Sequence, residues 1–189
     1  MWTGEDASFD VEFASRFRAK VIIVDPTPRA IRHFEEIQKN IGQPAVHSYV
    51  KGGKQPIASY DLRQISKGSL ILEPTALWVE TSKVKLFVPV NPNHVSRSIV
   101  NYQNNYSQDT LHIEVSATTL EATLAKCKLK TMSLMKLDIE GAEMNVIRNM
   151  LEKSIHARQL LVEFDDVHSP SERSKKYVED TDRILRHIG

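Results

Sequence analysis

The sequence predicts an α/β fold in which a mostly parallel sheet carries helices on both faces. Short apolar segments with strand character alternate with amphipathic helical segments at both ends of the chain, which is the pattern of parallel α/β folds. Carboxylates follow the apolar segments directly, as they do where strands of such a sheet end at a ligand site. The chain has 189 residues, about the length of one domain, so we expect residues 1–189 to form a single domain.

The N-terminal part predicts a helix, a strand and a second helix. Residues 6–18 form the first helix, and their apolar side chains recur on one helical face: Phe9, Phe13, Ala14 and Phe17. Residues 21–24 are short, apolar and β-branched, as expected for a central parallel strand. Thr27 and Pro28 predict the start of a second helix that ends near Ile41, because a capping hydroxyl precedes a proline in the first turn.

The rest of the chain predicts further strands and helices around a long polar loop. Four segments in the middle have strand character: residues 45–50, 69–79, 84–90 and 110–116. Residues 81–83 predict a hairpin turn between the second and third of these strands, and residues 91–109 form the polar loop. The C-terminal part alternates regularly: a helix at 118–127, a strand at 134–139, a helix at 142–152, a strand at 159–164 and a helix at 171–188.

Composition excludes several classes of protein. Apolar residues make up 41% and charged residues 26% of the chain, which is ordinary for a globular protein. A net charge of +1 argues against nucleic acid as the main partner. No apolar run approaches the ~20 residues of a membrane span, and the acidic N-terminus is unlike a secretory signal. Cys127 is the single cysteine, so there is no disulfide framework or zinc cluster, and we expect a cytoplasmic protein.

The segment from Lys136 to Glu143 contains the most informative carboxylates. Asp138 and Glu140 are two positions apart at the end of a predicted strand, so both side chains would leave the same face of it. Such a pair can deprotonate an acceptor hydroxyl, orient it, or hold an amino group of a cofactor. The alternatives are structural: Glu140 would cap the following helix, and Asp138 would pair with Lys136.

A second group of candidate residues lies near the N-terminus. Gly4 begins a loop that feeds the first helix, where backbone N–H groups attract an anionic group. Glu5 or Asp6 would hold an ammonium group there, or serve only as acidic helix caps. Asp25 follows the first predicted strand, 21 residues after Gly4, where a carboxylate can accept hydrogen bonds from a ribose; the alternative is a turn residue. The full Gly-x-Gly-x-x-Gly pattern of dinucleotide-binding proteins is absent.

The polar loop offers further candidates. His94, Ser96 and Ser98 would bind substrate or cover a cofactor, although the composition of a surface loop explains them equally well. His94 and His168 both fall on predicted loops near the carboxyl ends of strands, where either can serve as a general base. No histidine spacing predicts a dedicated metal site.

Four segments together resemble the FkbM-type methyltransferases, in the order in which that family has them: residues 4–10, 25–28, 91–101 and 136–143. The resemblance implies a Rossmann-like class I methyltransferase fold. It also implies S-adenosylmethionine as cofactor, and methyl transfer to an oxygen of a sugar, glycan or small metabolite. We expect the cofactor to be bound by Gly4, Glu5, Asp6, Asp25, Pro26 and Ser98. We expect Asp138, Glu140 and His94 to lie at the reacting atoms.

The chain departs from the family at both ends. Members have a strand before the glycine motif, whereas only Met1, Trp2 and Thr3 precede Gly4, and members continue beyond the helix that ends near Gly189. We therefore expect the first strand and a C-terminal hairpin to be missing, and weak activity as a result. Two rival interpretations stay open: a non-catalytic or fragmentary methyltransferase-like domain, and another nucleotide-binding α/β protein.

Overall fold

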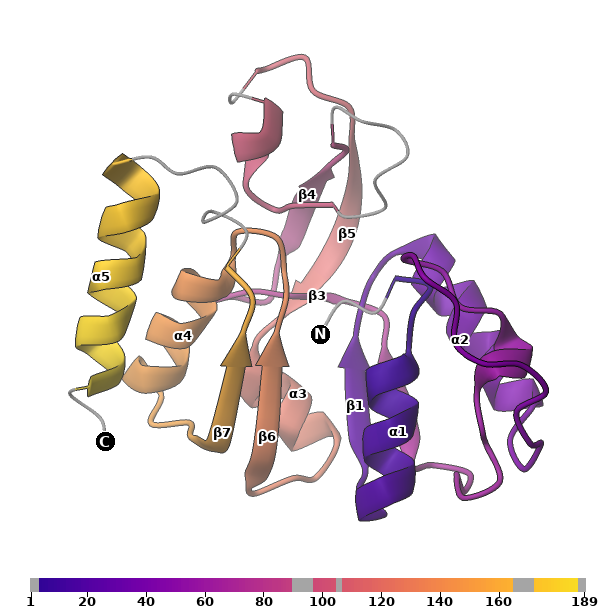
Figure 1. Cartoon of the computed structure of the whole chain (residues 1–189). Helices are drawn as coiled ribbons and strands as arrows, with labels where there is room; N and C mark the ends of the chain where they lie inside the picture. Colours follow the sequence, from indigo (N-terminus) through magenta and orange to yellow (C-terminus); the bar gives the residue numbers. More distant parts are fainter. Residues whose placement is uncertain (1–3, 90–96, 105–106, 165–171, 187–189) are drawn as a thin grey trace. The chain divides into compact units, whose positions relative to one another are not determined.

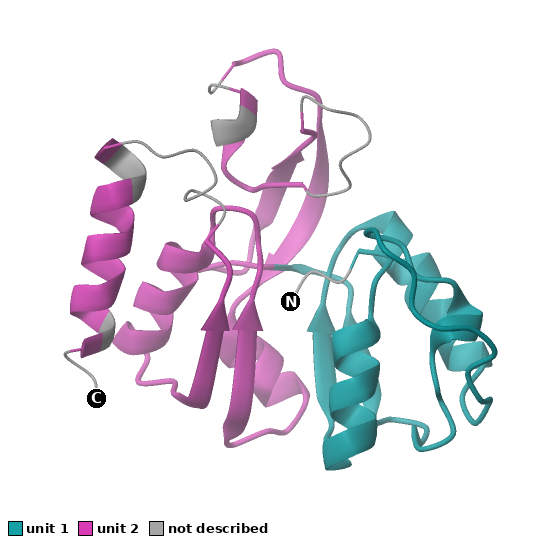
Figure 2. Ribbon diagram, in the orientation of Figure 1, with its two compact units in different colours: residues 1–76 teal, residues 77–189 magenta. Residues whose placement is uncertain are grey.

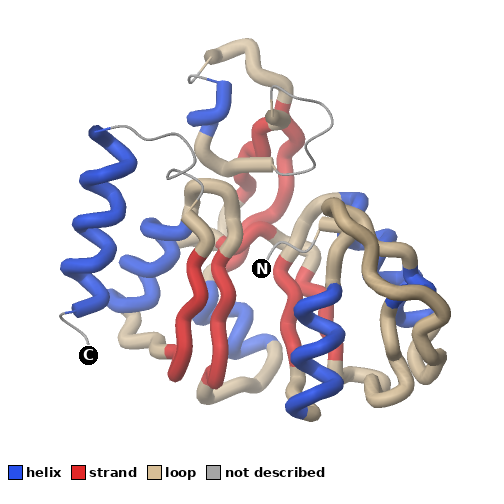
Figure 3. The backbone as a smooth tube through the Cα atoms, in the orientation of Figure 1, coloured by secondary structure: helices blue, strands red, loops and turns tan. Residues whose placement is uncertain are grey.

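A computed structural model of the chain describes residues 4–89, 97–104, 107–164 and 172–186 (Figure 1). The chain divides into two compact units, Met1–Ala76 and Leu77–Gly189 (Figure 2). Both units combine helices with short strands, as Figure 3 shows, so the α/β class is confirmed. Two of the strand pairs are parallel and one is antiparallel.

The first unit is built on one parallel strand pair. Its elements are α1 (Ser8–Phe17), β1 (Val21–Val24), α2 (Pro28–Lys39), the 3₁₀ turn η1 (Ile57–Ser59) and β2 (Leu70–Glu73). Val21 lies opposite Leu70, and the ladder continues to the end of both strands. The α1 and α2 helices and the segment around η1 share one apolar cluster: Ala7, Val11, Ala14, Ile37, Tyr60, Leu62, Ile65 and Leu70. The start of α2 is as predicted, because the Thr27 hydroxyl accepts the Ala30 N–H.

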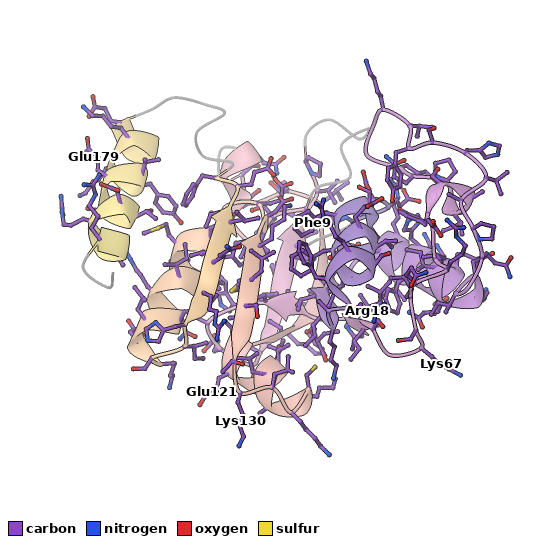
Figure 4. The ribbon with its side chains drawn as sticks, turned by 60° about the horizontal axis from the view of Figure 1, so that its bottom comes forward. Phe9, Arg18, Lys67, Glu121, Lys130 and Glu179 are labelled. Carbon is purple, nitrogen blue, oxygen red and sulfur yellow. The ribbon has the colours of Figure 1, made fainter. Side chains whose placement is uncertain are left out.

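The phenylalanines of the first helix lie along one side of it, but that side is not its most buried face. The buried residues of α1 are Asp10, Val11 and Ala14, whereas the Phe17 side chain is 62% exposed. Val11 and Ala14 turn toward the apolar cluster, and the three phenylalanines stack in sequence along another side of the helix, with ring centroids 5.8 and 4.8 Å apart. Figure 4 labels Phe9, the first of these rings, on α1.

The expected strand at residues 45–50 is also wrong. This segment has no strand pairing, and Val46 is 71% exposed. The amide groups of Val46 and His47 both donate to the Ala58 carbonyl, so the segment is held as an irregular loop. The segment was predicted as a strand because its apolar residues alternate with polar ones. The sequence does not show that no other strand lies beside it to pair with.

The second unit contains two further strand arrangements. The antiparallel strands β4 (Lys83–Phe87) and β5 (His112–Thr118) belong to a three-stranded sheet, and the short β3 (Ala76–Leu77) lies on the other side of β5. The parallel strands β6 (Met132–Leu137) and β7 (Ala157–Val162) form a separate pair. The helical elements of this unit are η2 (Asn101–Asn104), α3 (Leu120–Lys126), α4 (Glu143–Glu152) and α5 (Glu172–Arg186).

The predicted hairpin at residues 81–83 does not form. The expected strand at 69–79 is divided into β2 and β3, because Pro74 between them has no N–H to donate to a ladder. In the sheet order β3-β5-β4, β4 pairs with β5 and not with the strand that precedes it. The central position of β5 therefore depends on a pairing between segments that are far apart in the sequence.

Helix α4 buries four apolar side chains in the second unit. Met144, Val146, Ile147 and Met150 are inside, and the Thr181 hydroxyl of α5 contacts the sulfur of Met144. Lys130, between α3 and β6, points outward, as Figure 4 shows. No helix in the described ranges has both the length and the apolar character that a bilayer crossing requires.

Candidate active site

The turn between β6 and α4 has an unusual backbone. Glu140 has a φ of 56° and Gly141 a φ of 93°, so two consecutive residues adopt left-handed conformations. Such a conformation is ordinary for glycine but costs a side-chain-bearing residue about 1–3 kcal/mol. Strain of this kind persists only where the surrounding structure enforces it, which is frequent at functional sites. The carboxylate motif of the sequence therefore lies on a constrained turn.

Glu143 enforces the shape of this turn. Its side chain is 1% exposed, and Oε1 accepts hydrogen bonds from the Ile139 N–H at 3.1 Å and the Gly141 N–H at 3.0 Å. Both donors are backbone groups on either side of Glu140. Glu143 therefore stabilises the turn from inside, and its side chain is not accessible to a substrate.

Asp138 is held by a neighbouring lysine. The Lys136 Nζ donates to Asp138 Oδ2 at 2.8 Å, and both side chains are about three-quarters buried. This is the pairing that the structural interpretation of the sequence anticipated. Oδ1 of Asp138 accepts no hydrogen bond from the described residues, so one oxygen of a firmly oriented carboxylate is available for a ligand.

Ser98 binds directly to the strained turn. Its side chain is buried, its hydroxyl donates to the Glu140 carbonyl, and its oxygen accepts the Val100 N–H at 2.9 Å. A two-way backbone bridge with Phe87 holds Ser98 at the end of β4. The structure thus brings together two predicted site residues, Ser98 and Glu140, that are 42 positions apart. Glu140 does not cap α4, since its N-cap residue Ala142 has no side-chain cap.

In the first unit, Asp25 connects the end of β1 to the glycine loop. Asp25 is 0% exposed; Oδ2 accepts the Gly4 N–H at 3.0 Å, and Oδ1 accepts the Thr27 N–H and hydroxyl at 2.8 and 2.7 Å. Burial raises the pKa of Asp25, and the hydrogen bonds from Thr27 and Gly4 oppose that rise. The structure therefore joins Gly4 and Asp25 as their order in the sequence suggested, with Pro26 buried beside them.

The acidic residues of the glycine loop have partners within the same unit. Glu5 forms ion pairs with Lys54 at 3.0 Å and Arg29 at 4.0 Å. Asp6 accepts hydrogen bonds from the Ser8 N–H at 2.9 Å and from Gln55 Nε2 at 3.2 Å. The loop is therefore a preorganised acidic segment in front of α1.

Two residues that support the glycine loop, Tyr60 and His33, were not identified from the sequence. Tyr60 is fully buried, and its hydroxyl oxygen accepts the Ala7 N–H at 3.0 Å and lies 2.8 Å from His33 Nε2. The Tyr60 hydroxyl therefore joins the backbone of the glycine loop to the His33 ring through hydrogen bonds. His33 lies four residues before the buried Ile37 on α2. This helical spacing is the signal from which its inward orientation could have been predicted. Tyr60 lies in irregular backbone, where no periodicity identifies it.

We expect His33 to make the stability of the first unit sensitive to mild acid. Burial lowers the pKa of His33 below 6.5, although the nearby Glu5 and Asp6 carboxylates oppose this and Lys54 adds to it. The unfolded chain therefore takes up the proton at a higher pH than the folded one, and stability that is full above about pH 6.5 is lost as the pH falls through the folded pKa. The measurement is the free energy of unfolding of wild type and His33→Gln between about pH 8 and 5.

The exposed His47 supplies the control for this prediction. The stability advantage of wild type over His33→Gln should shrink toward low pH, and His47→Gln measures what a histidine-to-glutamine change does at an exposed position of the same unit. Asp25 is present in all three proteins, so its opposite contribution cancels. An advantage of wild type that grows as the pH falls would show that His33 is protonated in the folded protein.

Two candidates for a general base cannot be placed. His94 and His168 lie outside the described residues. Among the residues that are described, no group of three histidine, cysteine or carboxylate side chains could hold a metal ion.

Comparison with known protein families decides the assignment. The model of the methyltransferase FkbM domain matches residues 6–189, which is almost the whole chain. The chain belongs to this family. A search of curated proteins and a search of solved structures found no match.

As an FkbM methyltransferase domain, the chain confirms the resemblance seen in its sequence motifs. Membership of a methyltransferase family implies a methyl donor. The two acidic motifs of this FkbM domain follow β1 and β6, each a member of a parallel strand pair. Ligands of open α/β sheets bind beyond such carboxyl ends.

Proposed function

We propose that the chain is a methyltransferase that uses S-adenosylmethionine and methylates an oxygen of a sugar, glycan or small-molecule acceptor. The observation that carries the proposal is the match of the FkbM methyltransferase domain to residues 6–189. A Rossmann-like arrangement of the strands and a cytoplasmic location are part of the same proposal. The acidic strand ends support it, because a cationic methyl donor and an acceptor hydroxyl both require carboxylates.

The residues of the first unit have the chemistry that S-adenosylmethionine requires. Its ammonium and sulfonium groups are positive, and three carboxylates are gathered at the glycine loop: Glu5, Asp6 and Asp25. Oδ2 of Asp25 accepts one hydrogen bond, from Gly4, and a carboxylate oxygen can accept a second from a ribose hydroxyl. Because Asp25 is fully buried, we expect Gly4 to shift when the ribose binds.

The backbone N–H groups of the glycine loop already have acceptors, so we expect the loop to bind the methyl donor through its side chains. The Gly4, Ala7 and Ser8 amides donate to Asp25, Tyr60 and Asp6 respectively. A methionyl carboxylate would have to compete with these acceptors. We therefore assign the donor's hydroxyl and ammonium groups to the carboxylates and leave its carboxylate unassigned.

The residues of the second unit have the chemistry that an acceptor hydroxyl requires. When bound, the cofactor supplies an electrophilic methyl group with a good leaving group. The protein then has to orient the acceptor oxygen and remove its proton. We propose that Oδ1 of Asp138, fixed by Lys136, accepts the hydrogen bond of that hydroxyl and takes its proton, with Glu140 or His94 as the alternative base.

Titration calorimetry with S-adenosylhomocysteine and with NAD tests the choice of ligand. We expect S-adenosylhomocysteine to bind more tightly, and Asp25→Asn to weaken its binding by roughly tenfold or more, because a hydrogen bond to a charged acceptor is lost. The matched control is Asp61→Asn, an exposed aspartate of the same unit that pairs with Arg63.

The three interpretations of the sequence give different outcomes. Equal or tighter binding of NAD would favour another nucleotide-binding α/β protein. Binding of neither ligand would favour a non-catalytic domain. An unchanged dissociation constant in Asp25→Asn would reduce Asp25 to a structural residue of the loop.

A further inference from the structure

Arg97 has a buried donor group without an acceptor. Its side chain is partly buried, and Nη1 of the guanidinium is inaccessible to solvent and has no hydrogen-bond partner among the described residues. Other arginines of the described chain pair with carboxylates at the surface, as Arg63 does with Asp61 and Arg186 with Asp182. Arg97 differs from these two arginines because one of its guanidinium nitrogens is buried and has no acceptor among the described residues.

A guanidinium group cannot lower the free-energy cost of burial by losing its proton. Buried aspartate or histidine can become neutral, as the raised pKa of Asp25 and the lowered pKa of His33 illustrate. Arginine stays protonated in proteins, so a desolvated Nη1 keeps its charge and its unsatisfied N–H groups. An oxyanion removes that cost, because two oxygens of a carboxylate or phosphate match the guanidinium fork.

The backbone at Arg97 is joined to a residue that binds the strained turn. The following residue, Ser98, donates to the Glu140 carbonyl and is bridged to Phe87 on β4. The backbone that carries Arg97 is thus fixed on two sides. In the same turn segment, Asp138 is paired with Lys136 and so is not an isolated negative charge.

We propose that Arg97 binds an oxyanion of the methyl acceptor, so that the acceptor of this methyltransferase carries a carboxylate or phosphate group. This inference rests on the proposed function, because it takes the turn at Glu140 as the acceptor side of the reaction. It narrows the substrate class from any hydroxyl compound to an acidic sugar, a sugar phosphate or a hydroxy acid.

The test measures anion binding to the full chain without any methyl donor. Inorganic phosphate and, separately, malonate are titrated at constant ionic strength, and the melting temperature is recorded for wild type and Arg97→Met. We expect both anions or one of them to raise the melting temperature of wild type, and the affinity to fall by about tenfold or more in Arg97→Met. Whichever anion binds more tightly identifies the acceptor group as phosphate or carboxylate.

The controls separate this inference from its alternatives. Arg148→Met removes an exposed arginine on α4 and should leave anion binding unchanged. In the absence of anions, Arg97→Met should melt at the same temperature as wild type or higher, since it removes an uncompensated charge. The inference is overturned if neither anion raises the melting temperature of wild type, or if the anions raise that of Arg97→Met equally. It is also overturned if Arg97→Met melts at a lower temperature than wild type without anions.

The result can be read independently of the proposed function. S-adenosylhomocysteine should bind Arg97→Met as tightly as it binds wild type. A large loss of that affinity would overturn the inference, because the anion of Arg97 would then be the carboxylate of the methyl donor. If S-adenosylhomocysteine binds neither protein while Arg97 still binds phosphate, the anion site stands and the methyltransferase proposal fails.

Discussion

Replacing Glu143 with alanine is expected to destabilise the second unit by about 3 kcal/mol or more. The variant leaves the Ile139 and Gly141 amides buried without an acceptor, and a hydrogen bond to a charged group contributes roughly 1.5–3 kcal/mol. Without these bonds the left-handed backbone of Glu140 also loses its support. The free energy of unfolding from urea denaturation measures the loss, and hydrogen exchange at the Ile139 and Gly141 amides locates it.

Two variants make this result specific. Glu152→Ala removes an exposed glutamate from the same helix and should change stability by no more than about 0.5 kcal/mol. Glu143→Gln keeps a side-chain oxygen at the same reach and should lie between alanine and wild type. If Glu143→Ala and Glu152→Ala were equally stable, the turn would be held by something other than Glu143.

Replacing Tyr60 with phenylalanine is expected to cost the first unit about 1–3 kcal/mol. The substitution keeps the ring in the apolar cluster but leaves the Ala7 N–H and His33 Nε2 without their shared partner. Because Ala7 ends the glycine loop, we also expect weaker binding of S-adenosylhomocysteine. Chemical denaturation and calorimetry measure the two effects.

Tyr49→Phe is the matched control for the Tyr60 variant. Tyr49 belongs to the same unit, its ring packs edge-on against Tyr60, and its hydroxyl donates to Glu12 at the surface. Its loss should change stability by no more than about 0.5 kcal/mol. A Tyr60→Phe protein as stable as Tyr49→Phe would mean that the buried hydroxyl does not support the loop.

The local elements of the fold could be predicted because their signals are local. The strand Val21–Val24 was predicted with its observed bounds, since a β-branched apolar run between polar residues has few alternatives. The Thr27 cap fixed the start of α2 for the same reason. The segment at 45–50 and the hairpin at 81–83 were wrong because strand pairing depends on distant segments, such as β5 lying between β3 and β4.

In the candidate site, too, local features could be predicted and contacts between distant segments could not. The placement of Asp25, Asp138 and Glu140 beyond the ends of strands was visible from the apolar segments that precede them. The bond between Ser98 and Glu140 was not, since nothing in the two segments marks them as neighbours. Tyr60 was missed because its role comes from a hydroxyl that meets an amide 53 positions away.

The apolar cluster of the first unit has a consequence for the synthesis of the chain. All its members lie between Ala7 and Leu70, so every one of them has left the ribosome before the segment of β6 is translated. Domains generally fold in the order in which they are made, at about 5–20 residues per second. The loop that contains Gly4 and its anchors Asp25 and Tyr60 can therefore take shape seconds before the turn at Glu140 exists.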